Sequence, residues 1–337
     1  MALHAPLHSS VLPPTDDALI AGQFKIVAPL DSSLTGRTWL GRHAELDQPV
    51  IIKLMHVGSS PTVRARFERE ARALSCIAHP HVARLLAYGK TGDGRRYMVT
   101  EHTEGRTLRK VLQRWGRLPE GRALRVLDQI AQALEATHRA GLVHRNLKPE
   151  SVVLGETRDG TDLVKLTNFG LVRASFAMDD RLGDASTRTG AMTGTPKYWA
   201  PEQVLGDTAD ARTDVYAFGV VAFEVLTGKS PFESTTTEGF AWQHVHQPPK
   251  LTDRQGRARL RPALEMIVRR CLAKHPDQRF ASMTELREAL RKARGVARRE
   301  ARQRTLQGRV KAQLRRPEVW VTATVAFLAG LLGALVG

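Results

Sequence analysis

The segment HRNLKPES, residues 144–151, is the stretch on which the fold prediction depends. It places a histidine, two cations, an amide and a hydroxyl close together in a short loop. Before it, residues 118–141 have the apolar spacing of an amphipathic helix and end in a glycine suited to a helix C-cap. After it, the apolar run 151–155 predicts a short strand. We therefore expect a polar loop held between a long helix and a sheet.

Outward from this loop the hydrophobic pattern divides the chain into two parts. Strands are expected, from alternation and β-branched content, at 23–30, 37–43, 48–55, 82–89 and 95–102. One helix, 62–77, interrupts them. Further helices are expected at 107–116, 213–229, 238–246, 261–275 and 282–294, and a second short strand at 163–168. This order predicts an α+β, bilobal fold with a small β-rich lobe over 21–102 and a larger helical lobe over 103–293.

Charge is concentrated near one end of the chain. The net charge is +17, and the segment Arg287–Arg316 holds twelve Lys or Arg against two Glu. Because the remainder is only mildly basic, we expect no nucleic-acid partner. The two cysteines, Cys76 and Cys271, are far apart in apolar contexts, so we expect buried free thiols in a reducing compartment.

The two ends of the chain differ in composition. Residues 1–20 are rich in Pro, Ser and Asp and predict a disordered leader. Residues 319–337 carry no charge over a length close to that of a bilayer core, which predicts a transmembrane helix. The basic segment 294–318 precedes it and predicts a single-pass protein in the cell membrane with its folded part in the cytoplasm.

The basic stretch Arg287–Arg316 has two interpretations. It extends a solvated helix, or it lies against anionic membrane lipid, where each basic residue near the surface contributes about 1 kcal/mol. The adjacent apolar segment favours the second. Small residues at Ala326, Gly330 and Ala334 share one face of that segment and permit helix pairing, and hence a homodimer.

Several motifs occur in a fixed order along the chain. They are VIIKLM (50–55), FEREARAL (67–74), HRNLKPES (144–151), TNFGL (167–171), GTPKYWAPEQ (194–203), TDVYAFGVVAFEVLTGKSPF (213–232) and HPDQRF (275–280). Together they resemble the Hanks-type, eukaryotic-like serine/threonine protein kinases, and are similar to the bacterial membrane-anchored members. The resemblance covers about 270 residues. It implies ATP and Mg²⁺ as cofactors.

The resemblance also implies roles for individual residues. Lys53 would hold phosphates and Glu70 would be its ion-pair partner. Lys148 would contact the transferred phosphate, and Asp214 would hold the backbone of the catalytic loop. Glu202 would pair with Arg279. The positions expected around the nucleotide are Gly36, Ile51, Glu101 and Val153.

Other family positions are architectural or regulatory. His144 and Phe169 match the stacked hydrophobic spine that links the two lobes in the family. Arg145 is retained, so a phosphorylated Thr189 or Thr193 would have a cation on which to dock. The alternative is a Ser/Thr-rich loop that carries no modification. The Lys53–Glu70 pair has an alternative too, because it would fix the helix without any phosphate.

The chain departs from the family where chemistry is done. Asn146 stands at the position of the catalytic base, and an amide takes up no proton at neutral pH. Asn168 and Ser151 stand at the two metal-ligand positions, where the hard Mg²⁺ ion prefers charged oxygen. Of the glycines in the phosphate loop only Gly36 remains, and an acidic residue, Asp31, takes the place of another. The bulk of Ile51 is expected to crowd the adenine.

These departures lead to a main hypothesis and two alternatives. We expect a membrane-tethered pseudokinase that acts in signalling as a scaffold or allosteric regulator, with a protein partner that the sequence does not identify. The first alternative is a weakly active or unconventional Ser/Thr protein kinase that transfers the γ-phosphate of ATP using Lys53 and Lys148. The second is a lipid-responsive anchor whose folded domain is mainly a scaffold.

Overall fold

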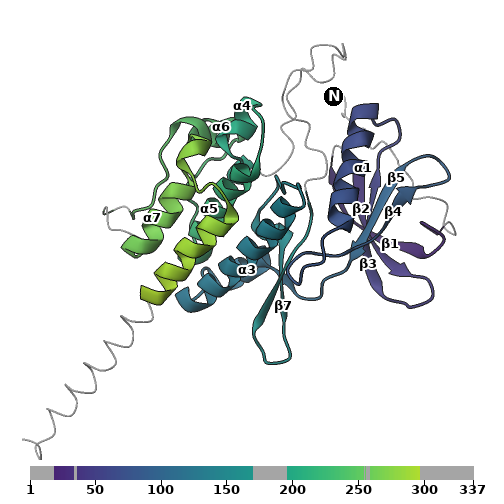
Figure 1. Cartoon of the computed structure of the whole chain (residues 1–337), viewed down its shortest axis with the longest axis horizontal. Coiled ribbons are helices and arrows are strands. Elements are labelled where there is room, and N and C mark those ends of the chain that lie inside the picture. The colour runs from purple at the N-terminus through teal and green to yellow at the C-terminus, as the bar shows by residue number, and fades with distance from the viewer. Residues whose placement is uncertain (1–18, 34–35, 170–195, 254, 256–258, 297–337) are drawn as a thin grey trace, which may run out of the picture. The chain divides into compact units, whose positions relative to one another are not determined.

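The computed structural model describes residues 19–33, 36–169, 196–253, 255 and 259–296 (Figure 1). The chain divides into one compact unit that ends at Arg287 and a second that begins at Glu288. The first unit contains a five-stranded and a three-stranded sheet together with helices α1 to α7. The predicted division into a sheet-rich small lobe and a larger helical lobe is confirmed within this unit.

The small lobe is an antiparallel sheet with strand order β1-β2-β3-β5-β4. Its strands are β1 (Phe24–Ser33), β2 (Gly36–His43), β3 (Pro49–Met55), β4 (Leu85–Lys90) and β5 (Arg96–Glu101). In β3, Val50, Ile52 and Leu54 are buried while the residues between them are partly exposed, which is the period of two expected for a strand with one covered face. The core cluster of this sheet also includes Phe24, Trp39, Tyr97 and Val99.

One helix, α1 (Pro61–Ser75), packs against this sheet. The hydroxyl of Ser60 accepts a hydrogen bond from the Val63 amide, and a proline follows at the first helical position, so the start of the helix is well defined. Phe67 and Leu74 are buried on the inner face. Cys76, at the C-cap, is exposed, so the prediction of a buried thiol is wrong there; Cys271 is buried as expected.

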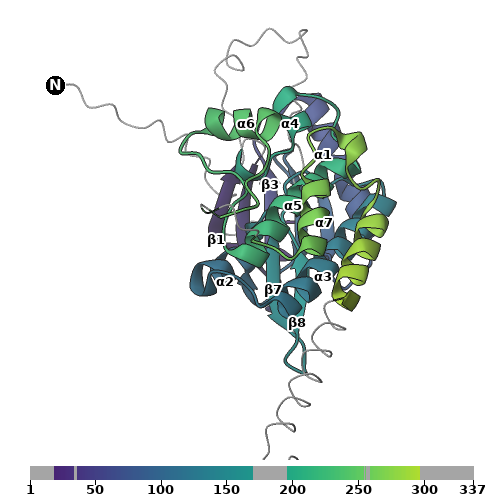
Figure 2. The same ribbon diagram turned by 90° about the vertical axis from the view of Figure 1, so that its left-hand side faces the viewer.

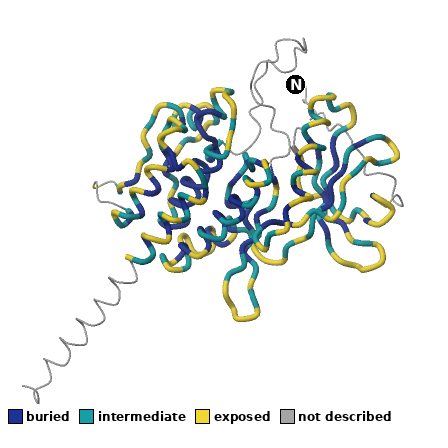
Figure 3. The backbone as a smooth tube through the Cα atoms, in the orientation of Figure 1, coloured by how far each residue is buried: buried dark blue, intermediate teal, exposed yellow. Residues whose placement is uncertain are grey.

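The large lobe is built around α5 (Ala211–Thr227), which lies among the other helices of the lobe (Figure 2). Every residue from Thr213 to Leu226 is buried, and the inner part of the lobe is largely dark blue in Figure 3. A helix that is apolar all round belongs in a core, and α3 (Glu120–Arg139) and α7 (Pro262–Cys271) pack against it. The other helices are α2 (Leu108–Trp115), α4 (Pro201–Leu205), α6 (Thr237–His246) and a last helix over 283–296. A three-stranded sheet has the order β6 (Arg106–Thr107), β7 (Val152–Glu156) and β8 (Asp162–Leu166).

Three features of the fold were not predicted from the sequence. The strand β6 and the helix α4 are too short to produce a periodic signal. The folded part also begins before the predicted boundary at residue 21, because Ile20 is 2% exposed and exchanges backbone hydrogen bonds with Phe24.

In the part of the chain that the structure describes, no helix has the length and apolar character needed to cross a membrane. The predicted span 319–337, and most of the basic segment 294–318, lie outside the described residues.

Candidate active site

The loop 144–151 follows α3 and ends in a short helical turn, Pro149–Ser151, that leads into β7; a buried carboxylate from α5 holds it. Asp214 accepts hydrogen bonds from the backbone amides of His144 and Arg145, each at 2.8 Å, and lies 2.7 Å from the Nε2 atom of His138. Burial acts to raise the pKa of Asp214, but these hydrogen bonds and the charge of His138 outweigh it and hold the pKa below its ordinary value. Arg145 has a φ of 60°, and the carboxylate therefore stabilises a backbone conformation that most residues avoid.

His144 connects this loop to the segment that carries Phe169. Their ring centroids are 4.9 Å apart, and both side chains are buried. The Nε2 atom of His144 lies 3.1 Å from the Thr167 carbonyl, and its Nδ1 atom accepts from the Asn146 amide at 3.2 Å. Burial lowers the pKa of His144, so the neutral ring, with Nε2 as donor and Nδ1 as acceptor, fits both contacts.

The three substituted positions differ in burial and in their contacts. Ser151 is fully buried, and its hydroxyl donates to the Lys148 carbonyl at 2.8 Å and accepts from the Lys148 amide at 3.1 Å. Its own carbonyl accepts from the Thr167 amide. Ser151 therefore closes the loop, and its oxygen is already engaged. Asn168 is exposed at a φ of 54°, a conformation that asparagine tolerates better than most residues.

These side chains do not fit the magnesium that the family uses. Asn146 and Asn168 supply neutral amides, and the Ser151 hydroxyl is committed to the backbone of Lys148. Magnesium binds through carboxylates and phosphates, because a neutral oxygen does not balance its charge. Among the described residues there is also no group of three His, Cys, Asp or Glu side chains arranged to hold a metal ion.

Among the described residues, Lys53 and Glu70 form no ion pair within 4 Å, although their charges act on each other, so the expected close pairing stays a prediction. Instead the Oε1 atom of Glu70 lies 3.6 Å from Nη1 of Arg145. Glu70 is 6% exposed, and burial raises the pKa of its carboxyl to about 7, although the charges of Arg145 and Lys53 act in the opposite direction. A long side chain on α1 thus reaches the loop cation, which is nearer than the lysine on β3.

Lys53 lies in a similarly desolvated position. Burial lowers its pKa, while the charges of Glu70 and then Asp31 act to raise it. The charge of Asp31 therefore acts on Lys53 from the phosphate-loop position. A phosphate that approached Lys53 would meet the charge of Asp31 as well.

The other expected nucleotide positions have structural roles of their own. A Cβ atom on Gly36 would lie 2.3 Å from the Leu54 carbonyl oxygen, so packing of β2 on β3 requires this glycine with or without a phosphate. Ile51 and Val153 are partly exposed on β3 and β7. Glu101, at the end of β5, is paired with Lys165 of β8, with Oε1 and Nζ 2.5 Å apart.

The end of the segment after residue 196 is anchored by a buried ion pair. Glu202 accepts two hydrogen bonds from the guanidinium of Arg279, each at 2.8 Å, and one from the Thr213 hydroxyl at 2.7 Å. The remaining donors of Arg279 bind backbone carbonyls. Both predicted modification sites, Thr189 and Thr193, lie outside the described residues.

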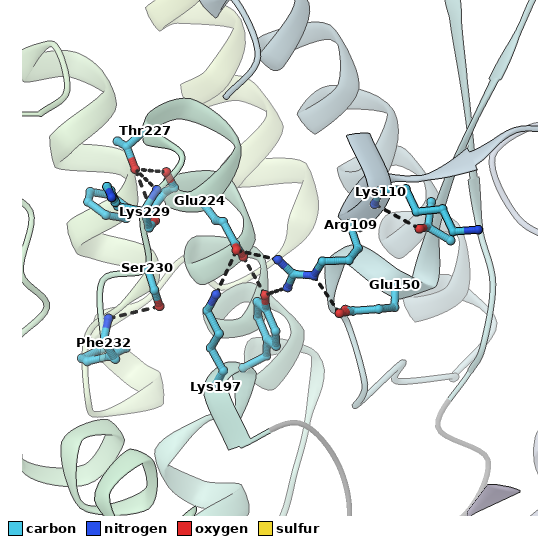
Figure 4. Close-up of polar contacts among 12 residues, drawn as sticks. Arg109, Lys110, Glu150, Lys197, Glu224, Thr227, Lys229, Ser230 and Phe232 are labelled. Carbon is cyan, nitrogen blue, oxygen red and sulfur yellow. Dashed lines mark hydrogen bonds and ion pairs between the residues drawn. The ribbon is translucent and has the colours of Figure 1, made fainter. Parts of the chain in front are cut away.

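A second polar cluster beside the loop was missed by the sequence analysis (Figure 4). Arg109 of α2 lies 2.8 Å from both Glu150 of the loop and Glu224 of α5. Lys197 and the Tyr198 hydroxyl also donate to Glu224, at 2.9 and 2.6 Å. Burial acts to raise the pKa of Glu224, but these donors hold it below its ordinary value. Most of these residues lie within the motifs quoted above, but no local pattern pairs them with one another, because they come from segments far apart in the sequence.

Comparisons with known proteins agree with this architecture. The protein kinase domain matches residues 32–291, and the chain therefore belongs to the protein kinase family. It is similar to the serine/threonine-protein kinase pkn3 of Myxococcus xanthus, at 37% identity over 80% of this chain and 50% of the relative. It is also similar to the serine/threonine-protein kinase PknB of Mycolicibacterium smegmatis, at 34% identity over 74% of this chain and 40% of the relative.

A comparison with solved structures shows the same fold. The crystal structure of the Mycobacterium tuberculosis PknI kinase domain aligns with a TM-score of 0.60 and 24% identity, and covers 83% of this chain and 99% of that one. At this identity the likeness shows the fold alone. The chain spans half or less of the length of the two curated relatives named above.

Proposed function

We propose that this protein is a pseudokinase, a member of the kinase family that acts in signalling as a scaffold or allosteric regulator. One observation carries the proposal. The loop 144–151 keeps its anchor on Asp214 and its contact with Phe169, while the groups expected to act on substrate and metal are neutral. Asn146 has no basic lone pair, and a general base contributes about 10²- to 10⁴-fold to rate.

The electrostatics around the nucleotide positions support the same proposal. Two neutral side chains stand where a divalent ion would need charged oxygen, and Asp31 lies near the lysine that would hold the phosphates. Phosphoryl transfer depends on positioning and on neutralising phosphate charge. A centre with these residues supplies little of either.

A transfer assay tests the proposal. The purified chain is incubated with radiolabelled ATP and excess Mg²⁺ or Mn²⁺, and label is followed into the chain itself and into a generic protein substrate. We expect no transfer above a protein-free blank. Transfer that disappears in a Lys53→Met variant would contradict the proposal, because it would require a working lysine-dependent centre.

The second candidate is a weakly active or unconventional Ser/Thr protein kinase, and the comparisons favour it over the first. The two relatives described above are themselves named serine/threonine-protein kinases. Lys53 and Lys148 remain as cations that a loose transition state would use. ATP and Mg²⁺ would then bind, and a saturable rise in melting temperature with Mg·ATP would support this candidate.

We further propose that residues 319–337 attach the protein to the cell membrane, with the folded domain in the cytoplasm and the basic segment against anionic lipid. The basic segment Arg287–Arg316 has less charge available to lipid than its composition suggests, because Arg287 is paired with Asp128 and Glu135. Binding to vesicles that contain phosphatidylglycerol should weaken as salt is added. Salt-independent binding would exclude the electrostatic part of this proposal.

A further inference from the structure

A cavity of about 570 Å³ lies in the large lobe, away from the loop 144–151. It is formed where the end of α2, the start of α3, the end of α5 and the start of α7 meet. Leu118, Leu226, Leu260 and Leu264 supply its apolar walls, and each of these side chains is at most 8% exposed. The volume is in the range of sites that bind a small molecule or a few side chains of a partner.

A tryptophan stands at the rim of this cavity and is held in place. Trp115 is 50% exposed, although tryptophan is on average among the more buried residues. The guanidinium groups of Arg114 and Arg122 lie 5.6 and 5.5 Å from its ring centroid. Arg122 is fixed in turn by two hydrogen bonds to Asp162, at 2.9 and 2.7 Å. The indole is therefore oriented before any ligand arrives, which reduces the entropy lost on binding.

The backbone around the cavity is also fixed. The Leu118 amide donates to the Val225 carbonyl at 3.0 Å, which ties the α2–α3 loop to α5. A Cβ on Gly228 would lie 2.9 Å from the Gly116 carbonyl oxygen, so the two chain segments are in close contact. Arg261 and Glu120 form an ion pair at 2.8 Å that ties α7 to α3. The cavity is thus a preformed feature of the lobe.

The rim is positively charged. Among its lining residues Glu120 is matched by Arg261, which leaves Arg117 and Arg259. Neither forms an ion pair with any residue that the structure describes. Arg117 is exposed, and the Nε atom of Arg259 donates to the Thr252 carbonyl at 2.9 Å. Tryptophan and arginine are the side chains most enriched where proteins bind partners, around an apolar pocket that takes an anchor residue.

We propose that this cavity binds an acidic peptide segment of a partner protein, with a leucine or aromatic side chain in the apolar pocket. Its carboxylates face Arg117 and Arg259, and its backbone lies along the face of Trp115. The charge and the shape both select against a basic or a purely polar peptide. The proposal is separate from the pseudokinase proposal, because none of these residues belongs to the loop 144–151.

Fluorescence anisotropy with three labelled peptides tests the proposal on the full chain. The probes are DEDLFDE, a second peptide with lysine in place of every acidic residue, and a third with serine in place of leucine and phenylalanine. We expect saturable binding of the first alone. The variants Arg117→Glu and Trp115→Ala should each weaken that binding about tenfold, and Arg117→Lys should retain it.

Arg158→Glu is the matched control, because Arg158 is exposed in the turn between β7 and β8 and the variant makes the same charge change elsewhere. Each variant is first shown to unfold at the same temperature as the parent. Absence of DEDLFDE binding would overturn the proposal, as would equal loss in Arg158→Glu. Phosphatidylglycerol vesicles form a separate arm. Vesicle binding that weakens in Arg117→Glu, with no peptide binding, would assign the cavity to lipid and also overturn the proposal.

Discussion

The two sides of the loop 144–151 differ in how strongly the rest of the fold constrains them. On the inner side, Asp214 of α5 is fully buried and accepts from two backbone amides and from His138. On the outer side, Asn146 is only partly buried and Asn168 is exposed. On the inner side, loss of the buried Asp214 carboxylate would leave its hydrogen-bond donors unpaired. On the outer side, no packing contact requires a charged side chain at Asn146 or Asn168.

This difference allows the fold to carry neutral side chains at Asn146 and Asn168 without a loss of packing. Removing a buried carboxylate leaves several donors unpaired, which few proteins tolerate. Replacing an exposed carboxylate by its amide changes neither volume nor packing. The need for a stable fold therefore keeps a carboxylate at Asp214, whereas only catalysis would keep carboxylates at positions 146 and 168.

The largest effect is expected from Asp214→Ala. The change leaves the amides of His144 and Arg145 and the ring of His138 without a partner inside the core, so the free energy of unfolding should fall by about 3–5 kcal/mol. Chemical denaturation measures this. Asp207→Ala, at an exposed position outside this network, is the control and should unfold at the denaturant concentration of the parent. Equal stability of the two variants would show that Asp214 does not anchor the loop.

Glu70→Gln tests the contact between α1 and the loop cation Arg145 through pH. The folded-state pKa of about 7 lies above the ordinary value of 4.5, so between these two pH values the carboxyl holds a proton only in the folded protein. Stability from this group is full below pH 4.5 and is lost as pH rises through 7. Glutamine does not ionise, so the variant should match the parent near pH 4.5 and exceed it by about 3 kcal/mol at pH 8.

Urea unfolding at several pH values measures the difference between Glu70→Gln and the parent. Glu156→Gln, an exposed position at the end of β7, is the control and should follow the parent at every pH. A Glu70→Gln variant that is less stable than the parent at pH 8 would show that the contact with Arg145 outweighs the cost of burying the charge.

A smaller effect is expected from Ser151→Ala. The lost hydroxyl leaves the amide and carbonyl of Lys148 without their 3.1 and 2.8 Å partners, which should lower the free energy of unfolding by about 1–2 kcal/mol. Thermal unfolding measures it, with Ser75→Ala on the exposed face of α1 as the comparison. If the two serines behave alike, Ser151 does not close the loop, and its hydroxyl would be available to a ligand.

Much of the fold was readable from periodic patterns, because long strands and helices repeat the same burial preference. The buried alternation of β3 and the unbroken apolar stretch of α5 are examples. The resemblance that the motifs carry implied that Asp214 holds the loop and that Arg279 pairs with Glu202, and the structure has both contacts. The short elements β6 and α4 were missed because two to five residues contain less than one full period of a pattern.

Contacts that depend on side-chain reach were less predictable. The sequence paired Glu70 with Lys53, but the carboxylate lies closer to Arg145, a choice set by the position of α1 and not by residue type. Gly36 was interpreted as a phosphate residue, although strand packing alone requires it. The cluster of Arg109 with Glu150 and Glu224 joins three distant segments and has no local signature.

The most direct test of the central claim is the effect of Mg²⁺ on nucleotide binding. The melting temperature is measured with ATP, with and without Mg²⁺, for the parent and for the triple variant Asn146→Asp, Ser151→Asn, Asn168→Asp. Since the missing charges are the proposed cause, Mg²⁺ should leave the parent unchanged and should add a saturable rise only in the triple variant. A Mg²⁺-dependent rise in the parent would contradict the account.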